Sequence, residues 1–118
     1  MSGELGREAR RSRRHALPGR PPVHDMLAEC VLGRALDMSA GGLKLLVAEP
    51  LPGDTLYQVR FDLELDDGRR TSIVAGIQVL DTRLDEDGLL CTGARFIHLE
   101  GVHARQLVQW LRVQAEAE

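Results

Sequence analysis

The sequence of 118 residues contains few of the residues from which disulfide scaffolds, metal sites and membrane anchors are built. Its two cysteines, Cys30 and Cys91, are too few for a disulfide scaffold and lack the spacing of metal ligands. The four histidines are scattered, so they indicate no zinc site. No apolar run approaches the roughly 18 residues of a membrane-spanning helix. We therefore expect a cytoplasmic protein without a metal, a cofactor or membrane insertion.

Catalytic patterns are missing as well. No histidine is accompanied by a partnered nucleophile, and Ser39 lacks the G-x-S-x-G surroundings of a catalytic serine. We therefore expect a protein that is not an enzyme, and we assign no catalytic residue.

The net charge of −3 is divided unevenly along the chain. Residues 1–20 carry six arginines against two glutamates, a net charge of +4, whereas the remaining residues carry −7. All basic residues except Lys44 are arginines, and the guanidinium group suits phosphate and guanine edges better than an ammonium group does. The cationic start therefore predicts contact with an anion. Because residues 1–19 are polar and end in glycine and proline, we expect them to form a flexible arm that packs no core element, with the folded domain at residues 20–118.

Short apolar segments separated by turn signals predict strands after the arm. Residues 23–37 are expected to be extended with an interruption at Gly33, either as one long strand or as a hairpin. Residues 55–65 largely alternate, and we expect Leu56 on the same buried face as Phe61. Further strands are expected at residues 43–48, 71–80 and 89–97, with turns or loops at 39–42, 49–54, 66–68 and 85–88.

The apolar period changes at the end of the chain. Val102, Leu107, Val108 and Leu111 fall on one stripe, with Trp110 as a further candidate, and this predicts a helix at about 101–114. A short sheet with open edges is prone to pair with other chains, so we expect about six antiparallel strands to close into a barrel with the helix packed across it. The expected fold class is mainly β.

Two motifs stand out. Residues 10–14 contain an R-x-x-x-R pattern from Arg10 to Arg14, and residues 37–42 contain a D-x-S-x-x-G pattern. Alone, the first is a solvated tail or a non-specific nucleic-acid patch. The second, alone, is a turn in which Asp37 and Ser39 bond backbone amides and the glycines take positive φ.

Together and in this order, the two motifs resemble the signature of the PilZ domain, the bacterial receptor module for cyclic diguanylate (c-di-GMP). The resemblance extends to residues 33–43, to the Pro/Gly loop at 49–54 and to Gly93-Ala94-Arg95-Phe96 with the helix that follows, so it covers residues 7–112. It implies a six-stranded antiparallel PilZ-type β-barrel with a C-terminal helix. It also implies a receptor whose arm becomes ordered on binding c-di-GMP and signals to an unidentified downstream protein.

The resemblance also implies which residues bind the ligand. An arginine can meet both acceptors of a guanine edge and can bond a phosphate through two donors. An ionised aspartate is a pure acceptor, so it suits the guanine N–H groups, and a bare glycine leaves room for a flat ring. The implied contacts are Arg10, Arg11, Arg14, Asp37, Ser39 and Gly42, with Arg7, Arg13 and Gly41 as auxiliary residues.

Two alternatives stay open. A PilZ-like adaptor for other proteins would bind no ligand, but such a protein would be expected to have lost the arginine and D-x-S-x-x-G residues. A small barrel that grips nucleic acid with its basic tail is the other alternative. The acidic body and the aromatic content of 3% argue against nucleic acid as a partner, because few side chains offer stacking surfaces.

Overall fold

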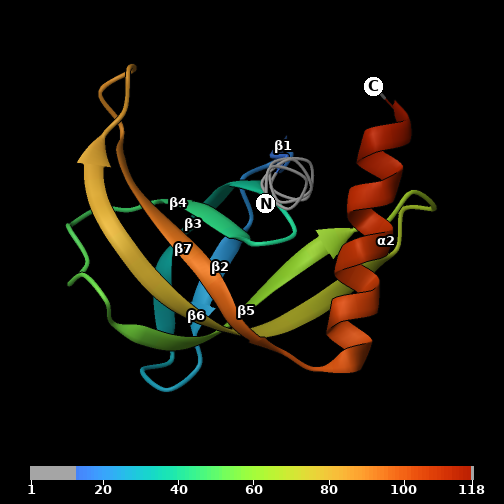
Figure 1. Cartoon of the computed structure of the whole chain (residues 1–118), viewed down its shortest axis with the longest axis horizontal. Helices are drawn as coiled ribbons and strands as arrows, with labels where there is room; N and C mark the ends of the chain where they lie inside the picture. The colour runs from blue at the N-terminus through green and yellow to red at the C-terminus, as the bar shows by residue number, and fades with distance from the viewer. Residues whose placement is uncertain (1–12, 118) are drawn as a thin grey trace, which may run out of the picture.

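Seven strands and one helix make up residues 13–117, the part of the chain that the computed structural model describes (Figure 1). The strands pair in antiparallel fashion in the order β1-β3-β2-β5-β6-β7-β4, and β4 pairs with β3 to close the ring. The elements are β1 (His15–Ala16), β2 (Pro22–Asp25), β3 (Cys30–Met38), β4 (Gly42–Leu46), β5 (Leu56–Glu64), β6 (Arg70–Leu84), β7 (Leu90–Leu99) and α2 (Gly101–Ala117).

The expected closed barrel of six antiparallel strands is confirmed, and β1 is an extra short strand on the edge of β3. The alternation that predicted β5 and β6 places Val59, Phe61, Leu63 and Ile73 in the core. Leu56 lies on the opposite face and is 62% exposed, so the expectation that it shares the face of Phe61 is wrong. An even-numbered residue on this strand faces solvent, as period-two geometry requires.

Residues 22–38 form a hairpin, which settles the choice that the sequence left open. The carboxylate of Asp25 accepts hydrogen bonds from the amides of Leu27 (3.0 Å) and Ala28 (3.1 Å), so this side chain stabilises the turn. Gly33 lies inside β3 and does not interrupt it. A Cβ at this position would lie 2.7 Å from the Leu46 carbonyl oxygen, so close packing against β4 requires glycine here.

Strand β6 is longer than its apolar pattern predicts and runs to Leu84 instead of ending near residue 80. The register of β6 against β7 shifts between Val79 and Thr82, and this irregularity breaks the alternation that predicted the strand. Figure 1 shows that the β6–β7 hairpin extends beyond the barrel. At its tip, hydrogen bonds from the backbone amides of Leu89 and Asp87 hold the pKa of Asp85 below its usual value.

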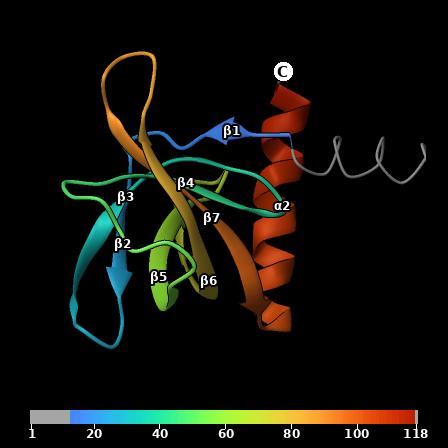
Figure 2. The same cartoon turned by 60° about the vertical axis from the view of Figure 1, so that its left-hand side comes forward.

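Helix α2 lies alongside the barrel (Figure 2). Leu107 and Trp110 are buried against the core, whereas Val102 and Val108 are about half exposed, so the buried stripe is narrower than the sequence predicts. The helix also continues three residues past the expected end at residue 114. Its last residues have no buried stripe and therefore gave no apolar signal.

The expected flexible arm differs from the structure at its C-terminal end. His15 and Leu17 are only 7% and 5% exposed, and the amide of Leu17 donates to the carbonyl of Leu36 (3.0 Å). The expectation that nothing before residue 20 packs as a core element is therefore wrong for Leu17. This one side chain reaches the core because the pairing of β1 with β3, continued by the Leu17 amide, directs it inward. The rest of the predicted arm, residues 1–12, lies outside the described residues.

Candidate functional site

Strand β1 brings one end of the arginine motif against the start of the D-x-S-x-x-G motif. In the register of β1 and β3, Ala16 lies opposite Asp37 and His15 opposite Met38. Arg14 directly precedes this short strand, and its Nη1 donates to Oδ1 of Asp37 over 2.7 Å. The two side chains are 47% and 22% exposed, so the pair forms at the surface and stays open to exchange with a ligand.

The turn between β3 and β4 is fixed by its own hydrogen bonds. The hydroxyl of Ser39 accepts from the amide of Gly41 (3.2 Å), as the ordinary turn interpretation predicts, and the Ser39 amide donates to the Gly42 carbonyl (2.9 Å). The amide of Phe96 donates to the Gly41 carbonyl (2.8 Å), so the turn is also tied to β7. This places Ser39, which is 3% exposed, beside the Arg14–Asp37 pair in a preformed corner.

Gly42 is required for a reason that the motif did not reveal. Neither it nor Gly41 has positive φ, so that expectation is wrong; among the described glycines the positive values occur at Gly19, Gly68 and Gly88. A Cβ on Gly42 would instead overlap the carbonyl oxygen of Ala94 and lie 3.0 Å from Cα of Arg95. The space that a side chain on this glycine would occupy is therefore filled by the backbone of β7.

A hollow of about 360 Å³ lies next to Arg14, between β4 and the extended β6–β7 hairpin. Three cations border it, Arg14, Lys44 and Arg83, together with two carboxylates, Asp81 and Asp85. Arg83 is paired with Asp81 over 3.0 Å, with both side chains exposed. Leu80, which is 43% exposed, and Gly93 add apolar and bare surface. The cations outnumber the carboxylates, and the Arg83–Asp81 pair is exposed and weak, so the hollow can take an anionic ligand with a flat apolar part.

Sequence reasoning missed Lys44 and Arg83 as members of this candidate site. Lys44 lies opposite Asp37 of β3 on one side and Gly93 of β7 on the other, and these two partners are 56 positions apart in the sequence. The alternation of β4 could have shown that Lys44 faces outward between the buried Leu43 and Leu45. Only the strand order shows which residues it faces.

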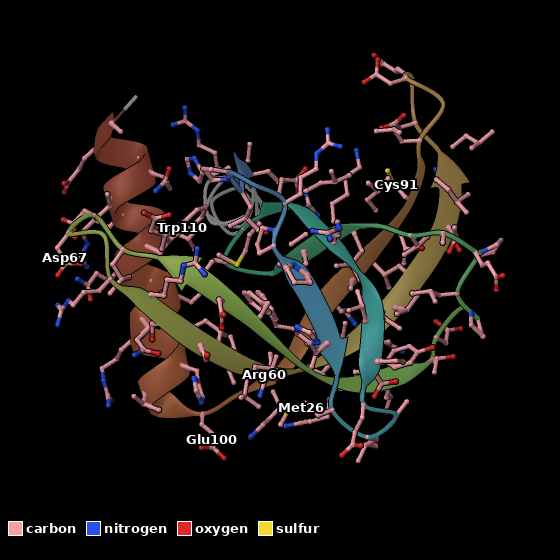
Figure 3. All side chains as sticks on the ribbon, turned by 180° about the vertical axis from the view of Figure 1, so that it is seen from behind. Met26, Arg60, Asp67, Cys91, Glu100 and Trp110 are labelled. Carbon is pink, nitrogen blue, oxygen red and sulfur yellow. The ribbon has the colours of Figure 1, made fainter. Side chains whose placement is uncertain are left out.

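Cys91, labelled in Figure 3, also borders the hollow. Burial raises the pKa of its thiol, and the nearby carboxylate of Asp85 acts in the same direction. The neutral thiol donates to Asp85 (3.7 Å). This side chain therefore stays protonated at neutral pH, which suits a wall of the hollow better than a reactive group.

The structure brings together five of the residues that the resemblance implied, and leaves others outside the described part. Arg14, Asp37, Ser39, Gly41 and Gly42 meet where β1, β3 and β4 join. Arg13 is exposed next to them. The candidate residues Arg7, Arg10 and Arg11 lie outside the described residues.

Within residues 13–117, no group of histidine, cysteine, aspartate and glutamate side chains could hold a metal ion. In the same part of the chain, no helix is long and apolar enough to cross a membrane.

Two solved structures are similar to this fold. The inhibitor of motility from Bacillus subtilis (MotI/DgrA) superimposes with a TM-score of 0.72 at 13% identity, covering 89% of this chain and 51% of that one. The PilZ domain of YcgR from Escherichia coli, solved with c-di-GMP, gives a TM-score of 0.61 at 18% identity. This match covers 91% of this chain and 92% of the YcgR domain. The chain thus spans about half the length of the Bacillus protein. No curated protein matches the chain in sequence.

The family model of the PilZ domain matches residues 8–112, which is nearly the whole chain and includes both motifs. The matched region contains all seven described strands and most of α2. The chain therefore belongs to the PilZ domain family.

Proposed function

We propose that this protein is a receptor for c-di-GMP with no catalysis of its own, acting in the cytoplasm. The observation that carries the proposal is the contact between Arg14 and Asp37, because it joins the two motifs at one corner of the barrel. Membership of the PilZ family supports it. The E. coli YcgR domain, which has the same fold, was solved with this dinucleotide.

In this proposal each described residue has a role that follows from its chemistry. Asp37 accepts the N1–H and amino protons of one guanine, while Arg14 turns to a phosphate or to the acceptor edge of the base. Ser39 and Gly41 form the corner beside them. Lys44, and Arg83 once it leaves Asp81, neutralise phosphate charge, and Leu80 offers an aliphatic surface to a guanine plane.

Arg10 and Arg11 complete the proposed site from the arm of residues 1–19, with Arg7 and Arg13 as auxiliary contacts. The barrel of residues 20–118 supplies the other half, including Asp37, Ser39 and Gly42. We propose that the arm becomes ordered on the barrel when the ligand binds, and that an unidentified partner protein recognises the altered surface.

The energetics favour an exchange of partners at the corner. Ordering a residue costs about 1–2 kcal/mol, but Arg14 already precedes a strand paired with β3, so little of that cost falls on it. Opening the exposed Arg14–Asp37 pair costs about 0.2–1 kcal/mol. Each new charge-assisted hydrogen bond to the ligand contributes about 1.5–3 kcal/mol. The exchange therefore releases free energy once both side chains reach the ligand.

Calorimetric titration of the full chain with c-di-GMP tests the proposal. We expect binding in the range of about 1 µM, corresponding to about −8 kcal/mol. A parallel titration with single-stranded DNA over a salt series distinguishes the nucleic-acid alternative, which requires binding that falls steeply with salt and ignores c-di-GMP. Absence of heat with c-di-GMP at saturating concentration would leave the adaptor alternative.

A further inference from the structure

A groove of about 620 Å³ separates α2 from the β5–β6 hairpin, and residues 17–22 form its third wall. Figure 3 shows the tip of this hairpin, at Asp67, beside the helix that carries Trp110. The groove shares no lining residue with the hollow beside Arg14. It is therefore a second concave surface, separate from the proposed ligand site.

The floor of this groove is apolar. Leu17, Leu63 and Trp110 line it, and each is at most 5% exposed. Leu65 and Val113, both partly buried, continue the same surface. A concavity of this size and lining can take one or two apolar side chains from another chain segment, and their burial contributes about 25 cal/mol for each Å² of apolar area.

The rim of the groove is acidic. Asp62, Glu64 and Asp66 are exposed along it and face a single lining cation, Arg70. The alternation of β5 creates this arrangement, because Leu63 points inward and its two neighbours point outward. Three carboxylates around an apolar floor attract cations and repel acidic segments. The complementary ligand is a peptide segment with an apolar side chain between lysine or arginine residues.

Leu17 links this groove to the proposed ligand site. Its amide donates to Leu36, the residue before Asp37, and it lies three residues after Arg14. Its carbonyl accepts from the amide of Arg20 (3.2 Å), which closes a turn beside the groove. A shift of β1 along β3 therefore moves the ion pair and the wall of the groove together.

We propose that the groove binds a basic segment of a partner protein, with one apolar side chain against Trp110, and that c-di-GMP changes this affinity by moving β1 and Leu17. The coupling to c-di-GMP rests on the proposed function, whereas the docking site itself does not. Charge complementarity and the apolar floor define the partner segment.

Trp110 is the only tryptophan of the chain, so its fluorescence reports on the groove directly. The probe is a synthetic peptide of about 12 residues with two central leucines flanked by lysine and arginine, and its control replaces every cation by glutamate. With the full chain, we expect the basic peptide to shift Trp110 emission with saturation and the acidic peptide to cause no shift. Joint neutralisation of the rim (Asp62→Asn, Glu64→Gln, Asp66→Asn) should weaken the basic peptide at least about fivefold.

A matched variant neutralises three exposed carboxylates on another part of the barrel (Asp81→Asn, Glu86→Gln, Asp87→Asn) and should leave the affinity for the peptide unchanged. Equal shifts of Trp110 emission with the basic and the acidic peptide would overturn the docking site. So would the absence of any shift at a basic-peptide concentration of about 1 mM. The joint variant Arg7→Ser, Arg10→Ser and Arg11→Ser tests another occupant in the absence of peptide. A change in its Trp110 emission would overturn the docking of a partner, since the occupant would be the chain's own first residues. Dimerisation that the rim variant abolishes would assign the groove to a second copy and would equally refute a partner.

The same titration with and without c-di-GMP tests the coupling, while calorimetry monitors c-di-GMP binding independently. We expect the affinity for the basic peptide to change at least about threefold when c-di-GMP is bound, and Leu17→Ala to reduce that change. Bound c-di-GMP with an unaltered peptide affinity would refute the coupling alone. Peptide binding without any c-di-GMP binding would support the groove and refute the proposed function.

Discussion

Replacing Asp37 by alanine is expected to weaken c-di-GMP binding by about 100-fold or more. The guanine loses two charge-assisted hydrogen bonds of about 1.5–3 kcal/mol each. Every 1.4 kcal/mol of lost binding free energy weakens the affinity about tenfold. The loss should be larger than for a residue that contacts only phosphate. In the proposed complex Asp37 is the acceptor for the guanine, whereas Lys44 and Arg83 share their task with other cations. Calorimetry on the variant and the unmodified chain measures the difference.

The same substitution should hardly change stability. The Arg14–Asp37 pair is partly exposed, so its removal lowers the free energy of unfolding by about 0.2–1 kcal/mol. Asp62→Ala, which removes a carboxylate from β5, is the matched control and should leave the affinity for c-di-GMP unchanged. An Asp37→Ala chain that unfolds at the same urea concentration and binds c-di-GMP as tightly as before would remove Asp37 from the site.

Gly42→Ala is expected to destabilise the barrel by about 3 kcal/mol, since the added Cβ meets backbone rather than a movable side chain. To relieve the overlap with the Ala94 carbonyl, β4 must move away from β7 and lose some of the ladder that closes the ring. Urea unfolding followed by circular dichroism measures this loss. The effect on ligand binding should follow from the loss of the fold.

Gly41→Ala provides the control for this prediction. A Cβ on Gly41 would have only the hydroxyl of Ser39 within reach, at 3.9 Å, and the position is exposed. We expect a change in the free energy of unfolding within about 0.5 kcal/mol. If Gly42→Ala were as stable as Gly41→Ala, close packing of β4 on β7 would not explain the glycine of the motif.

Much of the barrel could be predicted because its strands carry local signals. The alternation of residues 59–63 and 73–79 reflects the two faces of a sheet, and the Asp-Gly turns at Gly68 and Gly88 take the positive φ that glycine permits. The helix was found from its buried stripe. Its end was missed because Arg112, Ala115 and Glu116 in the last turns are exposed and add no apolar stripe.

The features that were missed depend on contacts between distant segments. Nothing around Leu17 predicts burial, since only pairing of β1 with β3 directs it into the core. The role of Gly42 depends on Ala94, and the position of Lys44 beside Asp37 depends on strand order. The motifs thus predicted which residues belong to the corner, while the fold explains what holds Gly42 in place and which cations stand near it.

Residue-by-residue chemical shifts of the full ¹⁵N-labelled chain, recorded during titration with c-di-GMP, test most directly whether one ligand is held by both motifs. We expect amides at residues 10–14 and at residues 37–42 to shift together, with a single saturation curve, and Lys44 and Leu80 to follow the same curve. Unchanged shifts in either motif at saturating c-di-GMP would contradict joint binding by the arm and the barrel corner.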